Sequence, residues 1–249
     1  MGMPITIEIV SIDNETNIVA KETLDKAFEY FNYVDETFST YKKQSEIMKI
    51  NRGDIKLQDA SEDMREIFKL AEITKRDTGG YFDIMNRDGT YDPSGIVKGW
   101  AIHNVAKLLK NAGFVDYYVE AGGDIEVSGN NSKREKWAIG IKNPLNQDEN
   151  VKIVRLMSQG IATSGTYIRG QHIYNPHDQS EVFSDIISLT IIGPNIYEAD
   201  RFATATFAMG RKGIEFIERL EIIGLEKLEG YIIDSCGIAT MTSGFDKYL

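Results

Sequence analysis

An α+β fold, with largely antiparallel sheets and packed helices, is the class that this sequence predicts. Short segments of alternating or continuous apolar residues occur in runs, and stretches with apolar residues at helical spacing are grouped between those runs. No GxGxxG motif lies between an apolar strand and a helix, so a Rossmann fold has no support. We expect residues 1–249 to form a single domain.

The first half of the chain is expected to contain one strand and four helices. Ile5, Ile7 and Ile9 alternate with polar residues, which indicates a half-buried strand over residues 4–10. Apolar residues at helical spacing or helix-boundary residues predict helices over 20–38, 44–51, 61–78 and 96–112. The segment 81–97 is rich in Gly, Asp and Pro and is expected to be a loop.

The second half is expected to contain most of the sheet. Apolar runs bounded by turn residues predict strands over 115–120, 124–128, 136–142, 152–158, 185–192, 229–234 and 237–241. Helical spacing returns over 197–209 and 212–221.

Composition excludes several classes of protein. The formal net charge of −10 argues against a nucleic-acid groove, because phosphate binding depends mainly on Lys and Arg. One cysteine, Cys236, allows neither an intrachain disulfide nor a cysteine-rich zinc site. The sequence contains no apolar run long enough to span a bilayer and no visible signal peptide. We expect a cytoplasmic protein, with a trimmed lipoprotein or secreted form as the alternative.

Asp200 and Thr204 are the strongest candidates for a metal site. They are four residues apart on a predicted helix, so their side chains lie on one face. A carboxylate and a hydroxyl are hard oxygen ligands, which suit Mg²⁺ better than zinc. The alternative is that Asp200 caps the helix and Thr204 is an ordinary helical residue.

Two further segments could hold an anionic ligand. Asp92 begins a turn that leads into a helix, and Lys98, in the predicted first turn of that helix, adds a positive charge near its free N–H groups. Gly122 and Gly123 lie between two predicted strands, where glycine permits close approach of a ligand and Asp124 could accept hydrogen bonds. A loop-to-helix junction and a tight β-turn are the respective structural alternatives.

Two more segments contain polar or aromatic candidates. Thr163 and Ser164 form a predicted turn, and His172 follows as a possible general base. Tyr41 lies in a polar loop, where its ring could stack on a flat heterocycle. Taken singly, His172 is better explained as a hydrogen-bonded structural histidine, and Tyr41 as a partly exposed surface tyrosine.

The order and spacing of these segments resemble the ApbE family of FAD:protein FMN transferases. The motifs that carry the resemblance are FSTYKKQSEIMKIN, GGYFD, DPSGIVKGWA, EAGGDI, ATSG, HIYNP and EADRFATATFAMG. Each motif is weak alone, and their joint order is specific. The resemblance covers the chain from its first residues to about Gly210.

The resemblance implies a bimetal or single-Mg²⁺ site at the pyrophosphate of FAD. Its implied metal ligands are the carbonyl of Gly95 and the side chains of Asp200 and Thr204. His172 is implied in catalysis. The positions implied to contact FAD or to line its cleft are Met1, Tyr41, Tyr81, Phe82, Asp83, Asp92, Lys98, Gly122, Gly123, Thr163 and Ser164.

The implied reaction moves FMN from FAD to a threonine of an acceptor protein and releases AMP. A FAD pyrophosphatase, which would use water as the nucleophile, and a non-catalytic FAD-binding protein remain the alternatives. The sequence departs from the family pattern at His103, where many relatives carry Asp, and in a shorter 84–92 loop. Near the C-terminus, DSCGIAT faintly resembles the acceptor motif of target proteins, and we interpret it as two strands and a turn.

Overall fold

The computed structural model describes residues 2–10, 14–165 and 185–249. Within them, seven strands form one sheet in the order β1-β2-β3-β6-β7-β8-β9, and every neighbouring pair is antiparallel. The strands of this sheet are β1 (Ile5–Ile9), β2 (Tyr117–Ala121), β3 (Asp124–Ser128), β6 (Gly160–Gly165), β7 (Ile186–Gly193), β8 (Glu229–Asp234) and β9 (Ala239–Met241). A separate antiparallel ribbon consists of β4 (Trp137–Asn143) and β5 (Asn146–Leu156).

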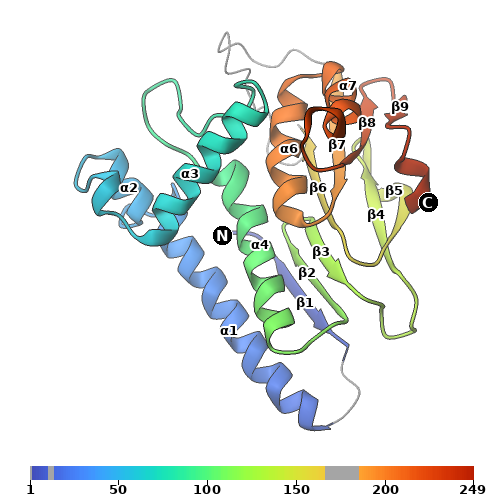
Figure 1. Cartoon of the computed structure of the whole chain (residues 1–249), viewed down its shortest axis with the longest axis horizontal. Helices are drawn as coiled ribbons and strands as arrows, with labels where there is room; N and C mark the ends of the chain where they lie inside the picture. Colours follow the sequence, from blue (N-terminus) through green and yellow to red (C-terminus); the bar gives the residue numbers. More distant parts are fainter. Residues whose placement is uncertain (1, 11–13, 166–184) are drawn as a thin grey trace.

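Helices cover one face of the large sheet and the β4–β5 ribbon lies toward the other face (Figure 1). The helices are α1 (Asn14–Phe38), α2 (Glu46–Asn51), α3 (Glu62–Asp77), α4 (Ser94–Asn111), α6 (Ile196–Ala208) and α7 (Lys212–Arg219). Short 3-10 helices occur at Leu57–Asp59, Glu221–Ile223 and Phe245–Tyr248. Among these elements, α4 and α6 lie beside the middle of the sheet, whereas α1, α2 and α3 lie outside them (Figure 1).

Two hydrophobic cores fill the spaces between these layers. The larger core joins the helices to the sheet and includes Trp100, Leu189 and Phe202. The smaller core joins the sheet to the ribbon and includes Trp137 and Phe245. Because both faces of the sheet are covered, its central strands are apolar on both sides, as in the sequence IISLTIIG of β7.

Strand alternation places two acidic side chains on the helical face of β3. Ile125 and Val127 contribute to the ribbon-side core. Asp124 and Glu126, which alternate with them, therefore point toward α4 and α6. Both carboxylates are buried, with Asp124 1% exposed and Glu126 8% exposed. This strand brings acidic groups beneath the two central helices.

The observed elements confirm the predicted α+β class, with several differences of detail. Helix α1 begins at Asn14, earlier than the predicted residue 20. Strand β5 begins at Asn146 rather than at 152, where it forms a hairpin with β4. Thr163 and Ser164 belong to strand β6, so the prediction of a turn there was wrong.

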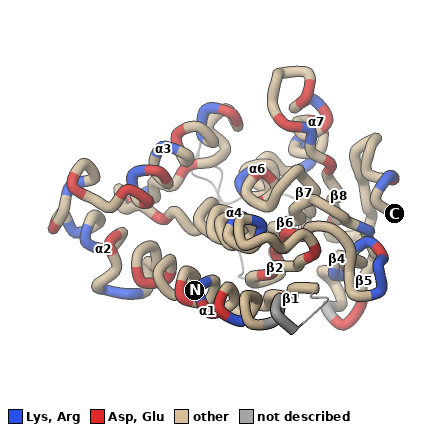
Figure 2. Tube along the Cα trace, turned by 60° about the horizontal axis from the view of Figure 1, so that its bottom comes forward, with Lys and Arg blue, Asp and Glu red and all other residues tan. Residues whose placement is uncertain are grey.

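Charged residues are distributed over the outer elements. Figure 2 shows acidic and basic residues interspersed along α1, α2, α3 and α7, with mostly uncharged residues along the sheet. Of the helices that the structure describes, none is both long and apolar enough to cross a membrane.

Candidate active site

The candidate site lies where α4 and α6 approach each other, through two contacts that are one helical turn apart. A methyl group on Gly95 would lie 3.5 Å from Oγ1 of Thr204. One turn later, the backbone N–H of Gly99 donates a 2.8 Å hydrogen bond to Oδ2 of Asp200. Since residue numbers rise along α4 as they fall along α6, the two helices are antiparallel here. Their contact places the three proposed metal ligands together.

Gly99 permits the close approach of the two helices. A methyl group at this position would lie 2.6 Å from Cβ of Asp200 and 2.9 Å from the carbonyl oxygen of Ile196. Both distances are shorter than van der Waals contact, so a larger residue would separate the helices. The N–H of Gly99 is also the helical donor four residues after Gly95. In this structure that N–H donates to Asp200.

Asp200 is not a helix cap. The N-cap of α6 is Asn195, whose side chain accepts a 2.9 Å hydrogen bond from the N–H of Glu198. Asp200 lies in the second turn of α6 and is 4% exposed. A buried carboxylate in mid-helix is costly unless cations or hydrogen-bond donors offset its lost hydration, and the capping alternative does not account for its position.

Lys98, Asp124 and Asp200 form a buried cluster, called here the carboxylate–lysine cluster. The Lys98 ammonium lies 2.5 Å from Oδ2 of Asp124 and 3.8 Å from Oδ1 of Asp200. Among the described residues, Oδ2 of Asp124 has this ionic contact but no directed hydrogen bond. The other oxygen, Oδ1, accepts a 3.2 Å hydrogen bond from the N–H of Thr163. Two carboxylates thus share one lysine.

The surroundings of Asp200 shift its protonation. Burial raises the pKa of Asp200 to about 7, the Lys98 ammonium opposes this rise, and the adjacent Asp124 carboxylate adds to it. The principal cause is loss of hydration of the charged form. A cation near Asp200 would favour the ionised carboxylate.

The donor set fits Mg²⁺. It comprises one carboxylate, one hydroxyl and one carbonyl, all oxygen atoms, which leaves further positions for water and phosphate oxygens. In the described part of the chain, no three His, Cys, Asp or Glu side chains gather in a metal-binding group. The proposed site therefore depends on the hydroxyl of Thr204 and the carbonyl of Gly95 in addition to Asp200.

Several residues implied in FAD binding lie around the start of α4. The ring of Phe82 is buried and would be 3.2 Å from a methyl group on Gly95. Asp83 pairs with Lys75 at 2.7 Å, and Tyr81 beside it is half-buried. Asp92 accepts a 3.0 Å hydrogen bond from the N–H of Ser94, the first residue of α4. Lys98 lies in the second turn of α4 rather than in the predicted first turn.

Gly122 and Gly123 form the turn between β2 and β3. Their φ angles are +60° and +93°, which glycine adopts readily and which two-residue hairpin turns often require. A methyl group on Gly122 would lie 2.7 Å from Sδ of Met3. The turn explains both glycines structurally, and a ligand role for them remains a proposal. Asp124, which follows the turn, belongs to the carboxylate–lysine cluster.

Thr163 and Ser164 are half-buried on β6. The N–H of Thr163 contacts Asp124, and its Oγ1 lies 2.8 Å from Oγ1 of Thr190 on β7. The structure therefore joins Thr163 to the cluster through its backbone. A contact of Ser164 with FAD remains a proposal.

Tyr41 lies between α1 and α2 and is 95% exposed. That segment is at the left of Figure 1, whereas α4 and α6 occupy its centre. Its exposure leaves the ring available for stacking, and its contact with flavin remains a proposal. Met1 and His172 lie outside the described residues, so the structure places neither of them.

Glu126 and His103 form a second polar contact that the sequence analysis did not identify. The two oxygens of Glu126 lie 3.1 and 3.0 Å from Nδ1 of His103 on α4. Oε2 also accepts a 3.1 Å hydrogen bond from the N–H of Ile196, the first residue of α6. The sequence contained a signal for this contact. In β3 the acidic residues alternate with Ile125 and Val127, so they lie together on the opposite face of a buried strand.

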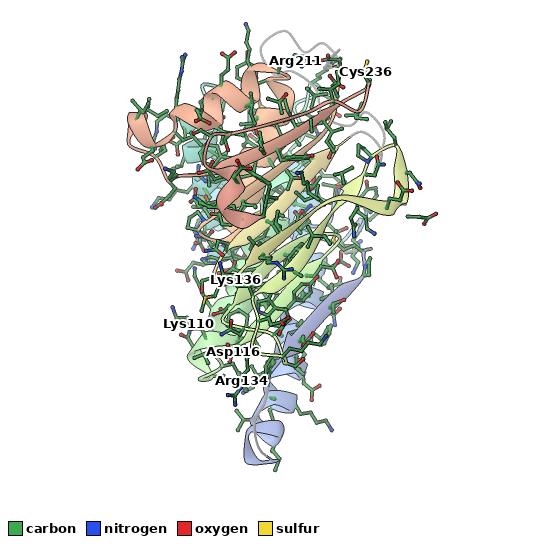
Figure 3. The ribbon with its side chains drawn as sticks, turned by 90° about the vertical axis from the view of Figure 1, so that its right-hand side faces the viewer. Lys110, Asp116, Arg134, Lys136, Arg211 and Cys236 are labelled. Atoms are coloured by element: carbon green, nitrogen blue, oxygen red, sulfur yellow. The ribbon has the colours of Figure 1, made fainter. Side chains whose placement is uncertain are left out.

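The DSCGIAT segment forms the end of β8, a turn and β9, which confirms the strand-and-turn interpretation. Asp234 accepts hydrogen bonds from the N–H groups of Cys236 and Ile238, at 3.0 and 2.9 Å. Its Oδ2 also pairs with Arg211 at 2.7 Å. Figure 3 labels Arg211 and Cys236 at the same end of the molecule. Cys236 is an exposed free thiol.

Comparison with known proteins agrees with this arrangement. A family model described as the ApbE family matches residues 1–88 and 85–225. The chain belongs to the ApbE family. Among curated relatives, the FAD:protein FMN transferase of Vibrio cholerae is 32% identical over 130 residues, which cover 49% of this chain and 39% of the relative. That of Salmonella typhimurium is 28% identical over 139 residues, covering 52% and 40%. These alignments span about two fifths of the relatives.

Solved ApbE structures share the whole fold of this family member. The flavin transferase ApbE from Vibrio cholerae has a TM-score of 0.80 at 23% identity, covering 100% of this chain and 96% of the other. The ApbE protein from Thermotoga maritima has a TM-score of 0.83 at 20% identity, covering 99% and 96%. At these identities, the two structures support the fold alone.

Proposed function

We propose that this ApbE-family protein transfers FMN from FAD to a threonine hydroxyl of an acceptor protein and releases AMP. The observation that carries the proposal is the alignment of Gly95 and Gly99 with Thr204 and Asp200. It brings hard oxygen ligands together beside Lys98. The names of the curated relatives supply the flavin and the type of reaction.

The proposed roles follow from the chemistry of these groups. Asp200, Thr204 and the carbonyl of Gly95 would hold Mg²⁺, which when bound neutralises charge on a diphosphate. Lys98 would bind a phosphate oxygen from the α4 side. The proposed flavin and adenine contacts surround this centre, at Met1, Tyr41, Tyr81, Phe82, Asp83, Asp92, Gly122, Gly123, Thr163 and Ser164.

In the proposed reaction, the threonine oxygen forms a bond to the FMN-side phosphorus. The bond from that phosphorus to the bridging oxygen breaks, and AMP leaves with its electron pair. The hydroxyl proton passes to a general base, for which His172 is our candidate. The products are FMN joined to the acceptor by a phosphodiester and free AMP.

The test is mass spectrometry of an acceptor protein after incubation with this protein, FAD and Mg²⁺. We expect a mass gain equal to FMN less one water on one threonine and loss of that gain in Asp200→Ala. His172→Ala should lower the rate of transfer by about two to four orders of magnitude, the usual contribution of a general base. Normal transfer by Asp200→Ala would contradict the metal assignment.

The same assay separates the two alternatives. Rapid release of AMP and FMN in the absence of an acceptor would identify a FAD pyrophosphatase. Tight FAD binding without AMP release, even with an acceptor present, would identify a flavin-binding protein without catalytic activity.

A further inference from the structure

Asp124 has a position in the site that the proposed transfer does not use. Its side chain is almost completely buried, and its Oδ2 lies 2.5 Å from the Lys98 ammonium. Asp200, the proposed metal ligand, is the more distant of the two acids, with its Oδ1 3.8 Å from the same nitrogen. Of the two acids that share Lys98, the one that is not a proposed ligand therefore lies closer to the ammonium.

We infer that Asp124 is a positioning residue that holds Lys98 on the β3 side of the site and keeps it from moving into hydrogen-bond contact with Asp200, from which it lies 3.8 Å away. This inference rests on the metal site of the proposed function. An ammonium bound directly to Asp200 would occupy the oxygen that a divalent cation requires. A lysine held by Asp124 stays close enough to contact a phosphate oxygen.

The position of Asp124 is fixed by the sheet. The residue is the first of β3, directly after the Gly122-Gly123 turn, and its Oδ1 accepts a hydrogen bond from the N–H of Thr163 on β6. One oxygen is thereby fixed to the backbone of a neighbouring strand, and the other faces Lys98. Lys98 itself has a long flexible side chain, so its location depends on its partners.

The charges of the three groups in the cluster determine how Asp124 affects cation binding. Two carboxylates and one ammonium give the buried cluster a formal charge of −1 when all three groups are ionised. Attraction between a buried ammonium and a carboxylate is strong, because little water screens it. If Asp124 loses its charge, Asp200 remains as the other carboxylate of the cluster near Lys98. Lys98 and the divalent cation then compete for Asp200.

The experiment measures Mn²⁺ binding by electron paramagnetic resonance on the full chain without FAD or acceptor. Wild type should bind Mn²⁺, and Asp200→Ala should not. Asp124→Asn should weaken the binding at least tenfold. The double variant Asp124→Asn/Lys98→Met should bind within threefold of Lys98→Met alone, because the competing ammonium is absent. Glu126→Gln is the matched control, since it neutralises another buried acid on β3 and should stay within threefold of wild type.

The position of Lys98 is tested separately from the effect of charge on Mn²⁺ binding. A metal-free crystal structure of Asp124→Asn should place Nζ of Lys98 about 3 Å from an oxygen of Asp200, a normal hydrogen-bond distance. A lysine that keeps its original place would overturn the inference. Unchanged Mn²⁺ affinity in Asp124→Asn, or no recovery in the double variant, would also overturn it.

One variant keeps the inference testable if Asp124→Asn does not fold. Lys98→Met alone leaves both carboxylates in place and should bind Mn²⁺ at least as tightly as wild type. Tenfold weaker binding by Lys98→Met would contradict the inference. Failure of wild type to bind Mn²⁺, or equal binding by Asp200→Ala, would instead reject the metal site of the proposed function.

Discussion

At the scale of single residues, Asp200 has two properties that each disfavour its ionised form. It is a carboxylate buried in the second turn of a helix, and it is adjacent to another buried carboxylate. A structure selected only for stability would place an apolar residue there, since a buried acid loses hydration. Its retention is consistent with a role toward a cation.

The protonation of Asp200 predicts how stability depends on pH. Burial raises the pKa of Asp200 to about 7, whereas a carboxyl in the unfolded chain titrates near its model value of 3.8. Between these values the folded protein binds a proton that the unfolded chain releases. The contribution of Asp200 to stability is therefore fully present below about pH 4 and declines as the pH rises to about 7.

Asp200→Asn should remove this dependence and leave the other titrations in place. The free energy of unfolding of wild type relative to Asp200→Asn should fall by on the order of 3 kcal/mol between pH 4.5 and pH 7.5, given about 1.4 kcal/mol per unit of pKa shift. Urea unfolding in EDTA at several pH values measures it. Parallel pH profiles of the two proteins would contradict the prediction.

At the scale of elements, the packing of α4 against α6 depends on Gly99. Gly99→Ala would put a methyl group 2.9 Å from the backbone oxygen of Ile196, and backbone cannot rotate away as a side chain can. We expect a loss of about 3 kcal/mol in unfolding free energy, the upper part of the usual range for overpacking. Ser94→Ala, an exposed substitution on the same helix, is the control and should change stability by less than about 0.5 kcal/mol.

Glu126 joins three elements, β3, α4 and α6. Glu126→Ala would leave the N–H of Ile196 and the ring of His103 without this partner. We expect a loss of about 1–3 kcal/mol, the typical cost of leaving buried polar groups unpaired. Glu126→Gln keeps one acceptor and one donor at the same place, so its unfolding free energy should fall by less than that of Glu126→Ala. Thermal unfolding of both variants measures the difference, and equal losses would show that geometry matters little there.

The sequence predicted most elements but not their contacts. Alternation and helical spacing sufficed for β1, α3 and α6, where propensity and burial agree. Strand β6 was missed because GIATSG has glycine at both ends and no alternation, and its pairing with β3 and β7 is what makes it a strand. For the site, the sequence suggested Asp200 and Thr204 through their spacing.

The pairing of Gly99 with Asp200 was not predictable from one sequence. The two residues are 101 positions apart, and no local pattern relates them. The same holds for Asp124, whose partner Lys98 belongs to a different element. Periodicity places a side chain on a face, whereas tertiary packing decides which face of another element it meets.

At the scale of the whole molecule, the two cores test our proposal that the chain is one domain. Trp100 lies in the core between the helices and the sheet, and Trp137 lies in the core between the sheet and the ribbon. Trp137→Phe and Trp100→Phe each leave one tryptophan as a fluorescent reporter. Because the two variants differ in stability, the fluorescence and circular dichroism transitions are compared within each variant and not between the variants.

We expect the fluorescence and circular dichroism transitions of each variant to coincide in urea, because the shared sheet links both cores. Within either variant, separate midpoints for the two signals would show that the ribbon layer unfolds independently.

The distance along the chain between α4 and α6 has a consequence for how the protein matures. During synthesis, α4 leaves the ribosome about a hundred residues before α6, so the oxygen atoms proposed for the cation cannot meet until five of the seven strands of the large sheet have been made. Metal loading would then be a late event. A chain terminated before α6 would gain none of the stabilisation that a bound metal ion supplies, about 2.7 kcal/mol when the metal concentration is one hundred times its Kd. Such fragments would be left to proteolysis, while complete molecules are retained.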